Sequence, residues 1–354
     1  MNVIDLIRRL VEAETPEAVN EVLTFELKGE AACERVGNHL LCRWHGPGDQ
    51  ILVLGHSDTV WPVGTVRTMP FREADGRLWG PGVLDMKGGL AIFIAAMRRA
   101  GPHNVLLQVN SDEETGSRTS KSLTERNALE SKAVLVLEPG TGLEGKLKTA
   151  RKGTGVYKVM VRGIAAHAGI DPASGANAIV ELAKQIEIIS TWAGVNAGVV
   201  RGGTRPNVIA AEAEVELDVR VSTTADLDVL DERFASLRPF DERCSLQIEG
   251  GLNRPPMERQ AHLFELAKKI DPALEQSATG GGSDGNFTAF LGVPTLDGLG
   301  AVGEGAHAAH ESMLINRIED RIALLTELIC RIPSSPDIPS RDEILSTSLR
   351  LPNT

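Results

Sequence analysis

Three short apolar runs in the first part of the chain constrain its fold more than any other feature. They are rich in Val, Ile and Leu, and they cover residues 51–55, 104–110 and 133–138. A stretch with helical spacing, residues 88–100, separates the first two runs, and a polar helix near residues 118–129 separates the last two. Buried strands that alternate with helices are typical of an α/β layer with a mainly parallel sheet. We therefore predict such a sheet.

The middle of the chain has a different pattern. Residues 154–163 and 207–221 alternate apolar and polar side chains, as half-exposed antiparallel strands do. With helices at 173–191 and 224–237 and a strand at 244–249, they predict a β-α-β-β-α-β unit of the ferredoxin-like type. The predicted fold class is therefore α/β, with an inserted α+β domain.

The two patterns divide the chain into domains. A chain of 354 residues exceeds the size at which one hydrophobic core usually keeps growing. Further elements are predicted outside the regions above, namely helices at 3–14, 17–28, 258–270 and 316–331 and a strand near 293–296. We predict a discontinuous main domain, an inserted domain and a loosely ordered tail, over residues 1–149 with 257–332, 150–256 and 333–354, respectively.

Charge and composition limit the partners of the protein. A formal net charge of -11 gives no basic surface of the kind that nucleic acid or an anionic membrane binds, so we expect neither partner. The N-terminal residues lack the apolar core of a signal peptide, and no later run approaches membrane-spanning length. These features favour a cytoplasmic protein.

The four cysteines are scattered without a CxxC pair. Their positions are Cys33, Cys42, Cys244 and Cys330. This spacing argues against a thiolate zinc site and against a dense disulfide framework. We predict buried free thiols.

Potential metal ligands stand at or just after the predicted strand ends, where open α/β sheets bind their ligands. Five of them come from distant segments: His56, Asp85, Glu114, Glu138 and His307. Two imidazoles and three carboxylates suit two zinc ions if one carboxylate bridges the metals. Co2+ or Mn2+ can substitute, because nitrogen and oxygen ligands do not discriminate sharply among such ions.

Each motif has a plainer interpretation when it is taken alone. The His56-Ser57-Asp58 pattern is short, Asp85 stands where a carboxylate can cap a helix, and the acidic run 112–114 can be a solvated turn. The glycine cluster 279–285 can be a flexible turn, and it lacks the Lys-Ser/Thr ending of a phosphate-binding loop. Only their common place at the strand ends of one predicted sheet favours a shared site.

The order and spacing of five motifs between residues 50 and 330 resemble the M20 metallopeptidases, and within them the glutamate carboxypeptidase group. The motifs are His56-Ser57-Asp58-Thr59-Val60, Gly82 to Gly88, Asp112 to Gly116, Glu138-Pro139 and Gly305-Ala306-His307. The resemblance implies that Asp85 bridges two ions, with His56 and Glu138 on one ion and Glu114 and His307 on the other. His310 competes with His307 as the ligand, but the preceding Gly-Ala and the spacing to Glu311 favour His307.

The resemblance also assigns catalytic roles. Asp58 would accept a hydrogen bond from the His56 ring and fix its orientation. Glu113 would be the general base, because it adjoins a ligand and is left to take a proton from the attacking water. His167 would donate to the oxyanion in the active site of a neighbouring subunit. The main domain is therefore expected to be catalytic, and the inserted domain to form a homodimer.

Substrate contacts and activity follow from the same resemblance. Asn207 and Arg220 match positions that hold a substrate carboxylate, and Gly281 and Gly282 lie in a turn whose amides approach the substrate. The implied activity is that of a carboxypeptidase that releases glutamate or a similar residue from peptides or N-acyl conjugates. An N-acyl amino acid deacylase of the acetylornithine or succinyl-diaminopimelate type remains open. A metal-dependent binding protein is a third interpretation, which the presence of Glu113 disfavours.

Overall fold

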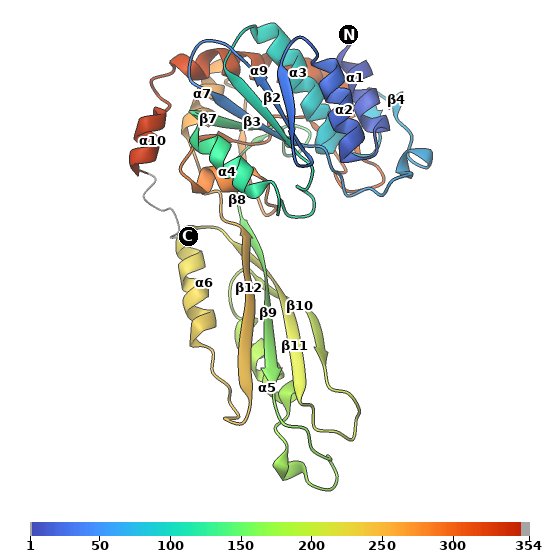
Figure 1. Cartoon of the computed structure of the whole chain (residues 1–354), viewed down its shortest axis with the longest axis vertical. Helices are drawn as coiled ribbons and strands as arrows, with labels where there is room; N and C mark the ends of the chain where they lie inside the picture. Colours follow the sequence, from blue (N-terminus) through green and yellow to red (C-terminus); the bar gives the residue numbers. More distant parts are fainter. Residues whose placement is uncertain (1, 348–354) are drawn as a thin grey trace. The chain divides into compact units, whose positions relative to one another are not determined.

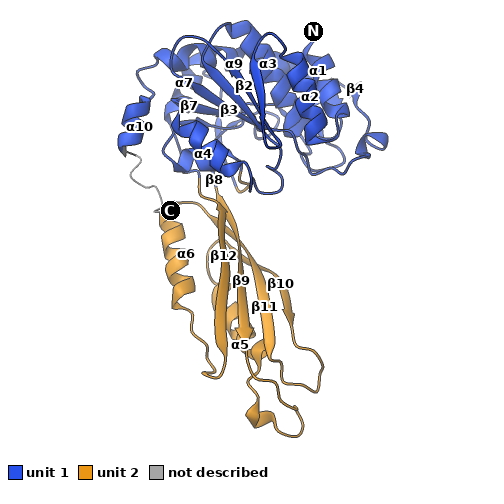
Figure 2. Ribbon diagram, viewed as in Figure 1, with its two compact units in different colours: residues 1–151, 257–279, 283–354 blue, residues 152–256, 280–282 orange. Residues whose placement is uncertain are grey.

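The computed structural model describes residues 2–347, which divide into two compact units (Figures 1 and 2). Unit 1 contains the described residues up to Arg151, Met257–Thr279 and those from Ser283 onward. Unit 2 contains Lys152–Pro256 and Gly280–Gly282. Within residues 2–347, no helix is long and apolar enough to cross a membrane.

The main sheet of unit 1 has six strands in the order β1-β2-β6-β3-β7-β14. Their bounds are Ala32–Val36, His39–Trp44, Val105–Asn110, Ile51–His56, Ala133–Val136 and Thr295–Leu296. β3 pairs in parallel with β6 and with β7, and β14 continues this parallel part beside β7. The hairpin of β1 and β2 adds an antiparallel edge next to β6. The prediction of a mainly parallel sheet is confirmed.

The apolar runs are continuous because both faces of this sheet are covered. Ile51 and Val53 of β3 belong to a core shared with five helices, and Leu52 and Leu54 belong to a second core on the other face. The helices of the first core are α1 (Val3–Glu12), α2 (Pro16–Glu26), α3 (Gly88–Ala100), α7 (His262–Ile270) and α9 (Ile318–Arg331). The second core includes residues of α4 (Lys121–Leu129) and Ile344 of α10 (Arg341–Thr347).

Helix α10 corrects the prediction of a loosely ordered tail. Ile344 is 3% exposed and packs in the second core, so part of the tail folds onto unit 1. The polar composition of the tail hid this contact, although Ile338, which is 2% exposed, also packs in the first core. Residues 348–354 of the predicted tail lie outside the described residues.

Smaller elements complete unit 1. β13 (Gln276–Thr279) pairs in parallel with β8 (Leu147–Arg151), and α8 (Gly285–Phe290) follows the glycine-rich turn. An antiparallel sheet has the order β15-β16-β5-β4, with bounds Gly303–Glu304, Ser312–Leu314, Arg77–Trp79 and Arg72–Ala74. These short strands carry too few residues for an alternating pattern, and the sequence did not predict them.

Unit 2 has the element order β-α-β-β-α-β that the alternating pattern predicts. Its elements are β9 (Gly153–Arg162), α5 (Ala178–Ile189), β10 (Val195–Gly202), β11 (Glu212–Val221), α6 (Thr224–Ser236) and β12 (Ser245–Arg254). The sheet order is β10-β11-β9-β12, and all three pairings are antiparallel. Val159 and Leu217 pack in one core with Leu182 of α5 and Phe234 of α6, whereas Val156 on the other face is 60% exposed.

Two local features differ from the predictions. Cys33 and Cys42 form a disulfide, because the hairpin of β1 and β2 places them directly opposite each other. Cys330 is exposed, and only Cys244 matches the expected buried free thiol. Helix α5 also begins later than predicted, after Asn177, whose side chain accepts hydrogen bonds from the first-turn amides of Ile179 and Val180.

Candidate metal centre

The five predicted metal ligands lie in unit 1, but only three of them stand at or near the carboxyl ends of neighbouring parallel strands, as the sequence predicted for all five. His56 ends β3, Glu114 lies in the loop after β6, and Glu138 follows β7. Because β6, β3 and β7 are adjacent and parallel, these three side chains start from the same edge of the sheet. Asp85 joins them from the turn before α3, and His307 from the loop between β15 and β16.

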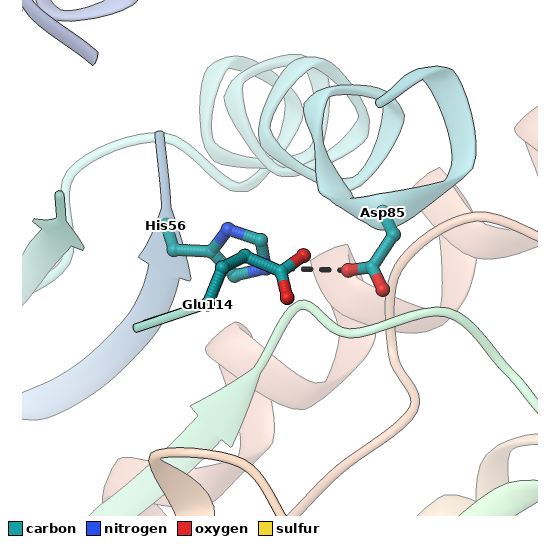
Figure 3. A group of neighbouring side chains, drawn as sticks. All are labelled: His56, Asp85 and Glu114. Atoms are coloured by element: carbon teal, nitrogen blue, oxygen red, sulfur yellow. Dashed lines mark hydrogen bonds and ion pairs between the residues drawn. The ribbon is translucent and has the colours of Figure 1, made fainter. Parts of the chain in front are cut away.

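Asp85 faces both imidazoles, one with each carboxylate oxygen. His56 Nε2 lies 3.2 Å from Asp85 Oδ1, and His307 Nε2 lies 3.4 Å from Asp85 Oδ2. Each imidazole has a second carboxylate neighbour: Glu138 Oε1 at 3.6 Å from His56 and Glu114 Oε1 at 3.0 Å from His307. The side chains of His56, Asp85 and Glu114 point toward one another (Figure 3). The arrangement has two halves that share Asp85.

The donor atoms fit divalent metal ions. Ligand atoms of His56, Asp85 and Glu114 all lie within 4.8 Å of one another, and so do those of His56, Glu113 and Glu138. Imidazole nitrogens and carboxylate oxygens are the ligands that zinc and related ions take in hydrolytic sites.

The backbone and surroundings distinguish the two imidazoles. His56 is 2% exposed, whereas the His307 side chain is 50% exposed. His307 has a φ of 63°, a backbone conformation that is uncommon for residues other than glycine. The ring of His310, the competing candidate, lies against Gly305. The structure therefore brings His307 to Asp85 and Glu114.

The pKa values of these groups shift in the directions that an excess of negative charge in the cluster produces. Burial opposes protonation of His56, but Asp58, Asp85 and Glu138 raise its pKa well above the usual value. Contact with Asp85 and the charge of Glu114 raise the pKa of His307 to about 9. Burial raises the pKa of Glu114, and the charge of Asp85 adds to the shift. Without metal, the imidazoles take up protons to balance crowded carboxylates, which is the role that cations would otherwise fill.

Asp58 contacts His56, but its carboxylate has a second task. The His56 Nδ1 atom lies 2.9 Å from the backbone oxygen of Asp58 and 3.5 Å from its carboxylate. The carboxylate accepts hydrogen bonds from the backbone amides of Glu113, at 3.2 Å, and Glu114, at 2.9 Å. Asp58 thus links the orientation of one imidazole to the placement of the acidic loop.

The three consecutive acids of this loop separate into different environments. Asp112 accepts hydrogen bonds from the backbone and hydroxyl of Thr119 and from the hydroxyl of Ser120, so it closes the loop on itself. Glu113 and Glu114 face the cluster, since both contribute ligand atoms to the groups around His56. Asp112 is therefore turned away from the metal-ligand cluster, and only Glu113 and Glu114 add their negative charge to it.

Sequence reasoning missed the buried cations behind Glu138. Arg151 Nη2 lies 3.2 Å and Lys148 Nζ 3.8 Å from Glu138 Oε2, the oxygen that faces away from His56. Burial and the charge of Asp85 would raise the pKa of Glu138, but His56, Arg151 and Lys148 lower it. Both cations belong to β8, a strand that was not predicted because its Lys and Arg have the pattern of surface residues. Their only sequence signal was a Lys and an Arg three positions apart near a domain boundary.

Two of the remaining candidates lie together in unit 2. The backbone of His167 pairs with that of Val208, and the amide of Ala168 donates to the Asn207 carbonyl at 3.0 Å. The His167 Nδ1 atom accepts from the amide of Gly169 at 3.2 Å. His167 and Asn207 therefore occupy the end of the sheet where β9 finishes and β11 begins.

The other candidates of unit 2 occupy the opposite end of the same strands. Arg220 pairs across the sheet with Thr154, near the start of β9, and its Nη1 donates to the Gly280 carbonyl at 3.2 Å. Asp218 holds the other edge of the guanidinium, with both contacts at 3.0 Å. A Cβ at Gly282 would lie 2.7 Å from Arg254 Cδ, whereas one at Gly281 would meet nothing within 4 Å. Of these two glycines, only Gly282 lies where its neighbours leave little room for a side chain.

A mainly parallel sheet that places His56, Glu114 and Glu138 at its strand ends, next to Asp85 and His307, forms a site of the kind that metal-dependent hydrolases use. The sequence shows to which family the protein belongs. The chain belongs to peptidase family M20/M25/M40, whose profile matches residues 52–331.

Individual relatives agree with this family and differ in their activities. The chain is 27% identical to carboxypeptidase G2 from Pseudomonas sp. (strain RS-16), over 90% of this chain and 84% of the relative. It is 30% identical to the succinyl-diaminopimelate desuccinylase of Alkalilimnicola ehrlichii, over 79% of this chain and 84% of the relative. Among solved structures, aminopeptidase PepT from Bacillus cereus shares the fold with a TM-score of 0.79 and 23% identity, covering 93% of this chain and 98% of that one.

Proposed function

We propose that the protein is a two-metal hydrolase that cleaves an amide bond next to a free carboxylate. Its substrates would be peptides or N-acyl conjugates, from which it releases C-terminal glutamate or a similar amino acid. The observation that carries this proposal is the position of Asp85, whose two oxygens face two different imidazoles. A single ion would leave one half of that arrangement unused.

The residues suggest how two ions would be held. Asp85 would bridge them, with His56 and Glu138 completing one half and Glu114 and His307 the other. Zn2+ suits this donor set, and Co2+ or Mn2+ can substitute. When bound, such ions lower the pKa of a coordinated water and polarise the scissile carbonyl.

Glu113 would handle the protons of the reaction. It adjoins a ligand, and the Asp58 carboxylate holds its backbone amide at 3.2 Å, which limits the movement of the acidic loop. A carboxylate placed in this way takes a proton from the attacking water and passes it to the leaving nitrogen. No covalent link between enzyme and substrate is needed for this sequence.

Carboxylate recognition would fall to polar groups of unit 2. Arg220 and the amides of Gly281 and Gly282 are the proposed contacts from one copy. Asn207 lies at the opposite end of the sheet, beside His167, so it would contribute from the second copy of a homodimer. Asp218 already occupies one edge of the Arg220 guanidinium, so a substrate carboxylate would take the edge that includes Nη1, where it would share this nitrogen with the Gly280 carbonyl. The likeness to carboxypeptidase G2 over 90% of the chain supports this assignment.

A homodimer would complete the site. Within one copy, eight residues of extended β11 separate Arg220 from Glu212, a strand length of roughly 26 Å. His167 lies beyond the Glu212 end, so one copy presents His167 and Arg220 at opposite ends of one sheet. We propose that His167 of one copy serves the metal centre of the other, where it would donate to the oxyanion.

The second candidate function is an N-acyl amino acid deacylase, which the 30% identity to a succinyl-diaminopimelate desuccinylase favours. A panel of N-acylglutamates, C-terminal glutamyl dipeptides, N-acetylornithine and succinyl-diaminopimelate would separate the two, with metal analysis of the same sample. Release of glutamate together with two equivalents of metal supports the first proposal. Turnover confined to the diamine compounds would reject it in favour of the second.

A further inference from the structure

Glu311 is a buried carboxylate of unit 1 that no ligand role accounts for. Its side chain is nearly inaccessible, with 1% of the residue exposed, and it lies four residues after His307. β16 begins at the next residue and pairs with β5, so the backbone that carries Glu311 is fixed by a sheet.

Four N–H groups converge on this carboxylate. Oε1 accepts from the backbone amides of Leu84, at 2.9 Å, and Asp85, at 3.1 Å. Oε2 accepts from the amide of Gly82, at 2.8 Å, and from the indole Nε1 of Trp61, at 2.9 Å. A carboxylate surrounded only by donors accepts all of them when it is ionised, which an amide of the same shape cannot do.

The loop that Glu311 holds is the one that carries Asp85. Gly82 opens this loop with a φ of 72°, and a Cβ there would lie 2.6 Å from the Thr59 side chain. The loop therefore passes too close to its neighbour for any side chain at Gly82. The Glu311 contacts fix the backbone at this glycine and at Leu84, and they reach the amide of Asp85 itself.

We propose that Glu311 is a positioning residue that holds the Asp85 loop, so that the two oxygens of Asp85 point to the two halves of the metal centre. The Glu311 carboxylate thereby joins three segments. Trp61 connects it to the segment after His56, the backbone amides connect it to the Asp85 loop, and Glu311 itself belongs to the segment of His307. The inference rests on the proposed two-metal function. Because Asp85 faces both halves, loss of Glu311 weakens the binding of both ions and not of one.

A Zn2+ titration against a chromophoric chelator tests this role. In Glu311→Gln the side-chain NH2 group faces N–H donors that the carboxylate had accepted from, so the Asp85 loop loses part of its support. The affinities for the first and the second Zn2+ should both fall by about tenfold to a hundredfold. Glu304→Gln is the matched control, because Glu304 is an exposed glutamate on neighbouring β15, and it should bind Zn2+ as wild type does. A Glu311→Gln protein that unfolds at lower temperature but binds both ions normally would show a merely structural role and overturn the proposal.

A milder variant keeps the test valid if Glu311→Gln does not fold. Trp61→Phe removes one of the four donors and leaves the carboxylate in place, and Zn2+ binding should weaken by up to about tenfold. Trp79→Phe, which removes an indole that donates to Ala74 instead, should change nothing. Equal Zn2+ affinities in the two Trp variants would also overturn the proposal. The number of ions bound by the wild type, read from the same titration, tests the two-metal function separately.

Discussion

The Arg151 guanidinium donates a hydrogen bond to each carboxylate oxygen of Asp297, from Nε and from Nη2, both at 2.8 Å. Both residues are buried, with exposures of 4% and 0%. Burial disfavours the charged guanidinium, but Asp297 and Glu138 more than offset this and raise the pKa of Arg151. Since Arg151 also contacts Glu138, the Asp297 pair fixes a cation against one proposed metal ligand.

Asp297→Asn should destabilise unit 1 strongly. It leaves a buried guanidinium without its main counter-charge, and removing one partner of such a pair costs about 3–5 kcal/mol. Denaturant unfolding followed by circular dichroism measures the change. Asp337→Asn is the control, because Asp337 pairs with Lys269 at 2.6 Å on the surface, where such a pair contributes little. Equal unfolding midpoints for the two variants would contradict the importance of the Arg151–Asp297 pair.

Glu113→Ala should separate catalysis from metal binding. Loss of a general base lowers turnover by about a hundredfold to ten-thousandfold. Metal content, measured by elemental analysis, should stay at the wild-type value, whereas Glu114→Ala should lose metal. A role of Glu113 as a metal ligand is the alternative, because its oxygens also lie within 4.8 Å of ligand atoms of His56 and Glu138. Metal loss in Glu113→Ala would make it a ligand and contradict its assignment as the base.

The sequence predicted the central strands well because their environment is uniform. Residues 51–56 are buried on both faces, so every position had to be apolar or small until His56 at the carboxyl end. β9 and β11 were also recognised, since one face packs on helices and the other meets solvent, but the predicted strand 207–221 began before β11 and no strand was predicted at β10. β8 was not predicted. Its Lys148 and Arg151 are buried in ion pairs with Glu138 and Asp297, whereas charged residues in a sequence usually indicate an exposed segment.

The type and order of residues predicted which candidate metal ligands would lie together, but not the contacts that support them. A His at the end of a strand and a carboxylate before a helix can be read from local sequence. The contact between Trp61 and Glu311 joins residues that are 250 positions apart, and no local pattern reports it. The disulfide between Cys33 and Cys42 shows the same limit, because only the hairpin register places the two residues opposite each other.

Glu181 should make the stability of unit 2 depend on pH. Burial alone would raise its pKa, but hydrogen bonds from Gln185 and from the amides of Phe240 and Asp241 lower it below 4.5. A carboxyl whose folded pKa is depressed stabilises the fold above its unfolded pKa and loses that effect as the pH falls through the folded pKa. Glu181→Gln should therefore be destabilised by about 1–3 kcal/mol at neutral pH, and the difference should shrink below about pH 4.

The control for this pH effect is Glu187→Gln, at an exposed position of the same helix. It should unfold like the wild type at both neutral and acidic pH. Unfolding curves for the three proteins at pH 7 and pH 3 provide the comparison. A Glu181→Gln deficit that stays constant across this range would mean that packing, and not the ionised carboxylate, stabilises unit 2.

Mixing two inactive variants tests whether His167 acts across a dimer. His167→Ala keeps Glu113, and Glu113→Ala keeps His167, so a mixed dimer contains one complete site if His167 serves the neighbouring copy. Random exchange between equal amounts makes half of the dimers mixed, and activity should return to about a quarter of the wild-type value. If His167 served its own copy, each site would lack one residue and mixing would restore nothing. A mixture of Glu113→Ala with Glu114→Ala is the control, since both variants damage unit 1 and no dimer of them can build a complete site.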